Sequence, residues 1–316
     1  GLLAADTVAE DAARRTNPLA LRRPHFAPKA KACICFYLEG APSQIDLWDP
    51  KPKLNELDGQ PLPESMTKTV RFAFIQKESA RLMGCPRTFT KHGECGMELS
   101  DFLPNLATCA DDIAWIRSMH TDQFNHHPGQ LMMNTGSALF GRPSMGAWIN
   151  YGLGSESHNL PGYVVLTSGR GTSGGSSSFQ SGFLPSSYAG VLFRSKGEPV
   201  LNLNTRMVER GVRFVNLYHA SWDHHSNLNE ELAFNCEMAD QPVAALIQDL
   251  KQRGLLDSTL VLWLSEFGRT PLGENRPGFA KVTGRDHHPF AFTLWAAGGG
   301  IKGGTIYGKS DEIGWG

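Results

Sequence analysis

Residues 32–38, Ala-Cys-Ile-Cys-Phe-Tyr-Leu, form an unbroken apolar run that ends at Glu39-Gly40. A short apolar run of this kind is typical of a buried parallel strand, because such a strand is covered on both faces before it opens into a loop. A second run, Leu-Val-Leu-Trp-Leu at 260–264, is followed by Ser265 and Glu266. The two runs predict strands of a mainly parallel sheet, each with a carboxylate just beyond the strand.

The rest of the chain alternates strand-like and helix-like segments. From Leu228 to Arg253 the apolar residues have the spacing of one helix face, and Pro242 is expected to kink or divide that helix. Further strands are expected at 114–118, 163–167, 212–218 and 290–297, further helices at 100–110 and 129–137, and a long loop rich in Gly and Ser at 168–187. This alternation predicts an α/β fold with a mainly parallel central sheet and helices on both faces.

Length, composition and charge limit the class of protein. The chain has 316 residues, a hydrophobic content of 41% and a formal net charge of -1 at pH 7. This balance gives no reason to expect nucleic acid or an anionic membrane as a partner, and no apolar stretch approaches the roughly 20 residues of a membrane span. We expect a leader remnant or linker at 1–30 and a single α/β domain at 31–316. The apolar segment 1–5 resembles the tail of a cleaved leader, and a processed or truncated terminus is the alternative.

The six cysteines leave the redox compartment open. Cys33 and Cys35 do not form the CxxC pair of a metal or redox site. Cys85 and Cys95 flank a glycine-rich loop and could pair in an oxidising compartment; the alternative is that all six are separate small hydrophobic residues.

Histidine is concentrated in adjacent pairs, at 126–127, 224–225 and 287–288. Two of the pairs follow an aspartate and give two Asp-His-His tripeptides, at 223–225 and 286–288. Because loops at the carboxyl ends of parallel strands meet at one edge of the sheet, these segments can converge. Imidazole and carboxylate together form the ligand set of zinc, manganese or iron. The pattern predicts a divalent metal site; for any one histidine, a solvated loop or a hydrogen-bonded core position is the alternative.

Acidic residues at strand ends complete the predicted site. Glu39, Asp46 and Asp49 follow the first strand, and we choose Asp46 as the ligand, although Asp49-Pro50 also fits a plain turn. Arg269 is expected to hold an anionic substrate, with a surface ion pair as the alternative. The predicted metal ligands are Asp46, Asp223, His224, His225, Glu266, Asp286, His287 and His288.

Several short motifs carry a family resemblance. They are Ser-Glu-Phe-Gly-Arg-Thr-Pro at 265–271, Gly-Arg-Asp-His-His-Pro at 284–289, Trp-Asp-His-His at 222–225, Ala-Gly-Gly-Gly-Ile-Lys-Gly-Gly at 297–304 and Asn-His-His-Pro at 125–128. In this order they resemble the bacterial "domain of unknown function" 1501 family, which is similar to sulfatases and belongs with the alkaline phosphatase superfamily. The likeness runs from about residue 30 to the end of the chain, and it implies an alkaline phosphatase or sulfatase-like fold.

The resemblance also implies roles for individual positions. Glu266 stands where the superfamily strand ends in an aspartate ligand, and Phe267 replaces the second ligand of that motif. His126 occupies the place of the reactive cysteine or serine of sulfatases, with Gln130 at the arginine position, so formylglycine chemistry is not possible there. The nucleophile is then a water activated by a divalent ion, or the hydroxyl of Ser43 or Thr121.

Together these patterns predict a periplasmic or secreted metal-dependent hydrolase of sulfate or phosphate esters, acting on a small-molecule or glycan ester. His126 and Arg269 are its expected catalytic residues, and zinc, manganese or calcium its expected ion. One alternative is a catalytically degenerate protein that binds a metal or anionic glycans without turnover, and another is an oxidoreductase that uses iron. The resemblance further implies that an internal helical segment near 202–212 and the C-terminal end are absent.

Overall fold

The run at 32–38 is strand β1 (Ala32–Leu38), which lies inside an eight-stranded sheet of order β12-β4-β11-β8-β1-β7-β5-β6. The computed structural model describes residues 17–63, 66, 72, 74–168, 172–193, 205–275 and 282–316, so the predicted leader tail at 1–5 falls outside the described residues. The other strands of this sheet are β4 (Ile113–Met119), β5 (Tyr163–Ser168), β6 (Val191–Phe193), β7 (Phe214–His219), β8 (Thr259–Leu264), β11 (Phe292–Gly298) and β12 (Thr305–Tyr307).

Most of the sheet is parallel. β1 pairs in parallel with β7 on one side and with β8 on the other, while β11 is antiparallel to both of its neighbours, β4 and β8. The predicted α/β class with a mainly parallel sheet is therefore confirmed. Two small antiparallel ribbons complete the strands, β2 (Phe89–His92) with β3 (Met97–Ser100) and β9 (Gly268–Gly273) with β10 (Arg285–His288).

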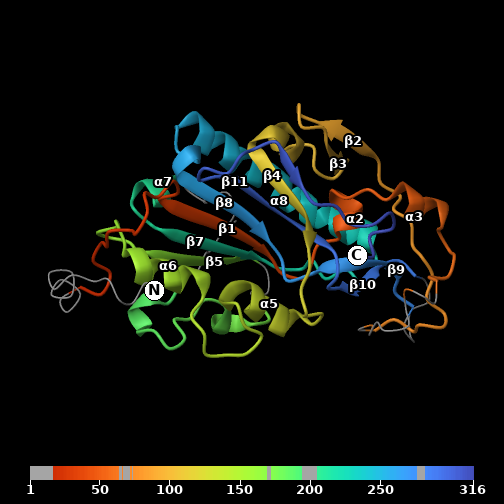
Figure 1. Ribbon diagram of the computed structural model, residues 1–316, viewed down its shortest axis with the longest axis horizontal. Helices are drawn as coiled ribbons and strands as arrows, with labels where there is room; N and C mark the ends of the chain where they lie inside the picture. The colour runs from red at the N-terminus through yellow and green to blue at the C-terminus, as the bar shows by residue number, and fades with distance from the viewer. Residues whose placement is uncertain are drawn as a thin grey trace.

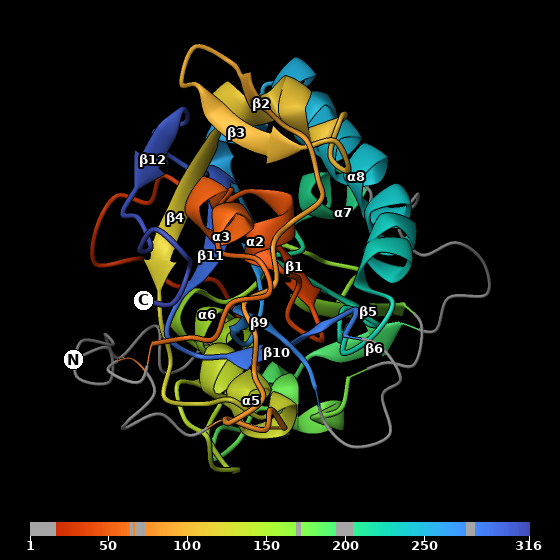
Figure 2. The same ribbon diagram turned by 90° about the vertical axis from the view of Figure 1, so that its right-hand side faces the viewer.

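Helices cover both faces of the sheet, with α8 on one side and α5 and α6 on the other (Figures 1 and 2). The helices are α2 (Gln44–Leu47), α3 (Pro52–Glu56), α5 (His126–Thr135), α6 (Met145–Leu153), α7 (Thr205–Glu209) and α8 (Leu228–Gln252). Because side chains alternate along a strand, β1 serves both layers. Ile34 and Phe36 pack in the cluster that includes the buried face of α8, and Cys35 and Tyr37 pack in the cluster on the α5 and α6 side.

One local prediction was wrong, and one of the two alternatives given for Pro242 was excluded. The helix expected at 100–110 is instead the end of β3 followed by a 3-10 helix at Leu106–Asp112, because Pro104 disfavours helical backbone in the residue before it. The helix around Pro242 is not divided, since α8 continues as one element to Gln252. Its long apolar face is buried against the sheet, and this packing outweighs the roughly 3 kcal/mol that an internal proline costs.

The helix predicted at 129–137 starts earlier than expected, at His126, with Asn125 as its N-cap. Pro128 lies in the first turn, where a missing backbone N–H costs nothing. The earlier start carries the His126 side chain to the helix N-terminus and toward the sheet edge.

All six cysteines are free thiols, so the pairing of Cys85 with Cys95 that we considered is not formed. Within the described ranges, no helix combines the length and the hydropathy that crossing a bilayer requires.

Candidate functional site

Three adjacent parallel strands end at acidic residues on one edge of the sheet. Glu39 follows β1, Asp223 follows β7, and Glu266 follows β8. Glu266 Oε1 accepts a hydrogen bond from the Gly40 backbone N–H at 2.8 Å, which ties the end of β8 to the end of β1. The carboxyl edge of the sheet thus gathers these side chains in one place, as in other open α/β sheets.

The Asp223 carboxylate is the centre of a histidine cluster. Its Oδ1 lies 2.9 Å from His225 Nε2 and 3.2 Å from His287 Nε2, and its Oδ2 lies 3.2 Å from His126 Nε2. One ligand atom from each of these four residues lies within 4.8 Å of the other three. The rings come from the start of α5, from the loop after β7 and from β10, so the cluster assembles only when the sheet edge and the β9–β10 ribbon are both in place.

The other nitrogen of each ring is held from outside the cluster. The Nδ1 partners are Glu266 Oε1 for His126 at 2.8 Å, Glu274 Oε2 for His225, and the Phe124 carbonyl oxygen for His287 at 2.7 Å. Each partner is an oxygen that accepts a hydrogen bond, which favours the tautomer with the proton on Nδ1. The three Nε2 atoms are then directed at one carboxylate.

His287 provides the clearest test of whether this arrangement fits a metal ion. Burial lowers the pKa of His287 to about 3, and the neighbouring Arg269 and His126 charges act in the same direction, so the ring is neutral at neutral pH. Its one proton belongs on Nδ1, because the Phe124 carbonyl oxygen can only accept. Nε2 and Asp223 Oδ1, both acceptors, then face each other at 3.2 Å. A cation bound to both atoms would turn this repulsion into attraction, and the donor set fits a divalent ion.

His126 is charged in the site as it stands. Burial lowers its pKa, but hydrogen bonds to Asp223 and Glu266 raise it further, to about 9. The imidazolium therefore lies between two carboxylates, and a metal ion that binds its Nε2 must displace a proton.

Arg269 lies behind Asp223 and not on the cavity surface. Its side chain is fully buried, and its guanidinium reaches Asp223 Oδ1 at 2.5 Å. Its other N–H groups donate to backbone carbonyls, those of Gly40, Ala41, Trp222 and Arg285. Burial raises the pKa of Asp223, but the histidines and Arg269 outweigh it and hold the pKa well below its usual range. In this geometry Arg269 fixes the Asp223 carboxylate, and direct substrate binding by Arg269 stays a prediction.

Three of the residues predicted as ligands lie outside the cluster. Asp46 is buried and accepts two hydrogen bonds from Arg285, at 2.8 and 3.2 Å. His224 Nε2 contacts the Asn235 amide at 3.2 Å, and His288 Nε2 contacts the Trp315 carbonyl at 2.7 Å. Burial lowers the pKa of both histidines to about 4, so each is a neutral core side chain here.

The remaining two predicted ligands, Glu266 and Asp286, border the cluster. Glu266 holds His126 from behind, as described above. Asp286 accepts backbone N–H groups from Phe74 at 2.8 Å, Ile75 at 3.1 Å and His287 at 2.8 Å. Both carboxylates shape the site through the residues that they hold in place.

Glu274 and Glu39 were not among the predicted site residues, although both lie at the site. Glu39 directly follows β1, so position at the strand end favoured it over Asp46, which belongs to the short helix α2. Glu274 follows β9, a strand of the small ribbon that was not predicted. No pattern in the sequence pointed to it.

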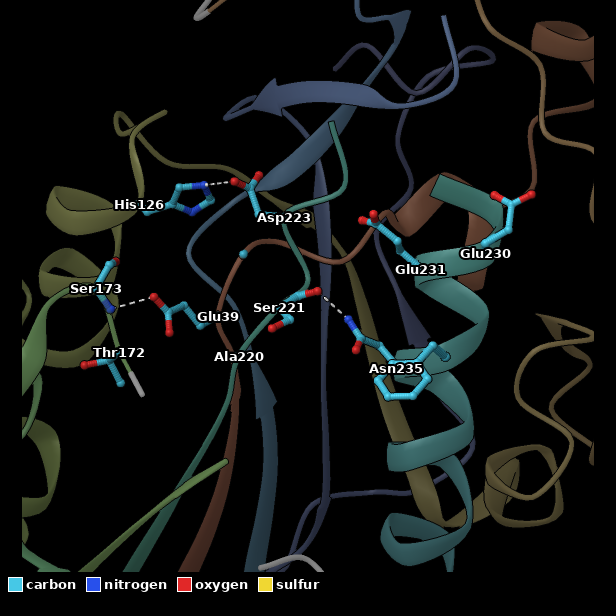
Figure 3. A pocket seen from close by; sticks show the side chains of 12 residues that line it. Glu39, His126, Thr172, Ser173, Ala220, Ser221, Asp223, Glu230, Glu231 and Asn235 are labelled. Atoms are coloured by element: carbon cyan, nitrogen blue, oxygen red, sulfur yellow. Dashed lines mark hydrogen bonds and ion pairs between the residues drawn. The ribbon is translucent and has the colours of Figure 1, made fainter. Parts of the chain in front are cut away.

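A cavity of about 770 Å³ opens beside the cluster. Figure 3 shows His126 and Asp223 facing each other at one end, Glu39 beside Ser173, and Glu230 and Glu231 on the α8 side. Glu39 Oε1 accepts a hydrogen bond from the Ser173 backbone N–H at 2.6 Å. The lining consists of Glu39, Gly40, His126, Thr172, Ser173, Ala220, Ser221, Asp223, Glu230, Glu231, Phe234 and Asn235. Among these described residues the lining is acidic and contains neither Lys nor Arg.

Comparison with known families gives one match over most of the chain. The model of the family described as "Protein of unknown function (DUF1501)" matches residues 30–207 and 203–316, in agreement with the resemblance found in the sequence motifs. No curated protein sequence matches the chain.

Alkaline phosphatases and sulfatases are among the solved structures similar to this chain. A TAB5 alkaline phosphatase mutant with bound Mg has 11% identity and a TM-score of 0.45, covering 91% of this chain and 96% of that one. An alkaline phosphatase superfamily protein from Vibrio parahaemolyticus has 11% identity and a TM-score of 0.48, covering 93% and 66%. The PsFucS1 sulfatase from Pseudoalteromonas sp. has 11% identity and a TM-score of 0.42, covering 96% and 67%.

Proposed function

The chain belongs to the DUF1501 family of proteins of unknown function, and we propose that it is a metal-dependent hydrolase of phosphate or sulfate esters. The observation that carries the proposal is the set of three imidazole Nε2 atoms around Asp223, each with its Nδ1 held by an oxygen acceptor. A histidine that ligates a metal almost always donates its other N–H in this way. The periplasmic or secreted location expected from the resemblance is part of the same proposal, and cell fractionation tests it.

The donor set favours one group of metals. Calcium and magnesium take oxygen ligands, whereas imidazole suits zinc, manganese and related transition metals. Three nitrogens and one carboxylate oxygen match the ligand types and the coordination number of a zinc site. Of the ions considered from the sequence, we therefore favour zinc or manganese over calcium.

The residues have distinct tasks in the proposed reaction. Asp223, His126, His225 and His287 would hold the ion. A divalent ion at such a site supplies a Lewis acid for an ester oxygen and lowers the pKa of water. Arg269 keeps the Asp223 carboxylate in one orientation by contact with its Oδ1.

The hydroxyls that face the cavity differ from those considered at first. Ser43 Oγ donates to Asp46 Oδ2 at 2.5 Å and is buried, and Thr121 is not among the lining residues. Thr172, Ser173 and Ser221 line the cavity. These three are the side chains of the described lining from which a protein nucleophile would come.

The negative charge of the cavity lining disfavours one alternative, a catalytically degenerate protein that binds anionic glycans. Glu39, Asp223, Glu230 and Glu231 line the cavity, and carboxylates repel a polyanionic chain. A neutral or cationic alcohol portion of the ester meets no such repulsion, and the proposed ion would offset the charge of the phosphate or sulfate group. The lining thus supports a small ester over an anionic glycan, while metal binding without turnover stays the second candidate.

Elemental analysis and a substrate screen test the proposal together. The purified protein is expected to contain about one zinc or manganese per chain, and His225→Ala with His287→Ala is expected to lose it. His158→Ala, at an exposed histidine outside the cluster, is the matched control and should retain the metal. Aryl phosphate, phosphodiester and sulfate substrates then separate hydrolase from binder. Metal-free wild-type protein, or equal turnover in the double variant and the control, would refute the proposal.

A further inference from the structure

Glu274 is a buried carboxylate in contact with a histidine of the cluster. It directly follows β9, its side chain is fully buried, and its backbone N–H donates to the Gly284 carbonyl at 2.9 Å. Its Oε2 contacts His225 Nδ1. Burial of an ionised carboxylate is costly unless the charge is paired, and the His225 ring is one such partner.

We propose that Glu274 is a positioning residue of the metal centre, which keeps the proton of His225 on Nδ1 and turns Nε2 toward Asp223. The inference rests on the proposed metal site. His225 links the two carboxylates, because its Nε2 lies 2.9 Å from Asp223 Oδ1 while its Nδ1 meets Glu274. The ring is therefore fixed at both nitrogens, and only Nε2 is directed at the cluster.

The pair of Glu266 and His126 repeats this arrangement on the other side of Asp223. His126 Nδ1 lies 2.8 Å from Glu266 Oε1, and its Nε2 lies 3.2 Å from Asp223 Oδ2. Glu266 is fully buried, as Glu274 is. Two buried carboxylates from different strands thus orient two rings toward one central carboxylate, which is the pattern by which outer carboxylates fix the tautomer and raise the basicity of metal-binding imidazoles.

The rival interpretation makes Glu274 a ligand of a second ion, because His225, Glu274 and Asp286 also offer atoms within 4.8 Å of one another. The orientation of His225 and the partners of Asp286 argue against it. Asp286 already accepts three backbone N–H groups, and His225 directs its Nε2 at Asp223, so its Nδ1 carries the proton toward Glu274 and offers no lone pair there. The two interpretations differ in the number of ions bound.

Metal titration of the metal-free full chain tests the role of Glu274. Calorimetry with Zn²⁺ and visible spectra with Co²⁺ are expected to show one site, whose Kd rises about 10- to 100-fold in Glu274→Gln with unchanged stoichiometry. Glu274→Asp keeps the charge and should recover part of the affinity. Glu237→Gln, at an exposed position of α8, is the matched control and should bind like the wild type.

A double-mutant cycle shows whether Glu274 acts through His225. In a His225→Ala background, Glu274→Gln should change the Kd less than twofold. An equal loss in both backgrounds, or a second ion lost with Glu274, would overturn the inference while leaving the metal centre in place. A wild-type protein that binds no metal would overturn both, and absence of ester turnover alone would affect only the hydrolase proposal.

A measurement on the native protein covers the case in which Glu274→Gln does not fold. Two-bond ¹H–¹⁵N spectra of the zinc-loaded wild type should show the His225 ring protonated at Nδ1 and metal-bound at Nε2, with the signal missing in His225→Asn. The opposite tautomer would contradict the proposed role.

Discussion

Asp46 was predicted from the sequence to be a metal ligand, and the variant Asp46→Asn tests whether it stabilises the fold instead. Asp46 and Arg285 are both essentially fully buried, and two hydrogen bonds join them, at 2.8 and 3.2 Å. Removal of one partner from a buried ion pair typically costs about 3–5 kcal/mol, because the other charge is left uncompensated. In Asp46→Asn, Arg285 keeps its contacts with the carbonyls of Met83 and Gly84, so we expect about 3 kcal/mol, at the lower end of that range.

The assay combines urea unfolding with zinc titration. At roughly 2 °C per kcal/mol for a chain of this size, Asp46→Asn should also lower Tm by about 6 °C, while the zinc Kd stays within about twofold of the wild type. Asp249→Asn, which removes an exposed pair with Arg253, is the control and should cost at most about 0.5 kcal/mol. A variant that loses zinc but less than about 1 kcal/mol of stability would refute the reasoning and make Asp46 a ligand.

The pH dependence of this pair has a definite sign. Burial raises the pKa of Asp46, but the Arg285 guanidinium outweighs it, and the net pKa lies below the ordinary value of 3.8. The stabilisation is therefore present above about pH 4 and is lost as the pH falls through the lowered folded-state pKa. The stability difference between the wild type and Asp46→Asn should shrink on acidification, and a constant difference down to pH 2 would contradict the ion-pair assignment.

Three further outcomes follow from the site. Gly40→Ala should weaken zinc binding more than tenfold, because Gly40 has a φ of +110° and a Cβ there would lie 2.4 Å from Asp223 N. The control Gly59→Ala, with positive φ but open space, should lower the free energy of unfolding by only about 1 kcal/mol. Equal zinc affinity in both variants would count against a role of this close approach in metal binding. Zinc affinity should rise about tenfold per pH unit up to about pH 9, because the metal displaces the proton of His126. In the metal-free protein, protonated His126 stabilises the fold fully below its ordinary pKa of 6.5, and this contribution is lost as the pH rises through about 9. Over pH 6–9, the zinc affinity from isothermal titration should therefore rise while the stability from urea unfolding of the metal-free protein falls. Phe267→Ala should lower the free energy of unfolding by about 3–5 kcal/mol, as a large-to-small core change does. It should also raise the zinc Kd, because the ring packs against His126. Loss of stability with unchanged zinc affinity would limit Phe267 to a packing role.

Much of the fold was predictable because it follows from short-range patterns. The apolar runs at 32–38 and 260–264 are the strands β1 and β8, as expected, and the structure pairs them in parallel. Once two strands are parallel and adjacent, their carboxyl ends meet without any further information. The sequence could therefore place Glu266 and the residues after β7 at one edge of the sheet before any contact was known.

The choice between neighbouring histidines was not predictable in the same way. Successive side chains of a strand point to opposite sides, so one member of the pair in β10 faces the cluster and the other faces away. His287 turns to Asp223 and His288 to Trp315, and this depends on the register of β10 against β9. Register is a long-range property of the ribbon, and the repeated Asp-His-His tripeptide is the same in either register.

Asp46 shows the same limit for acidic residues. Its partner Arg285 is 239 positions away in the sequence, and only the folded chain reveals that the carboxylate is already neutralised. A buried aspartate that looks like a ligand in sequence can instead compensate a buried cation, and composition alone does not distinguish the two.

Phe267 bears on how many ions the proposed centre can hold. The resemblance places it where superfamily members have a second ligand, and its ring lies 4.7 Å from the His287 ring and 5.2 Å from the His126 ring. An aromatic ring offers no lone pair to a divalent ion, and this one fills the space beside the two imidazoles with a side chain that is 1% exposed. The ring therefore restricts the rotation of both histidines and occupies the space from which another donor would reach them. Phe267 thus stiffens the two imidazoles beside it, which favours the proposed centre with one ion held by Asp223 and three imidazoles.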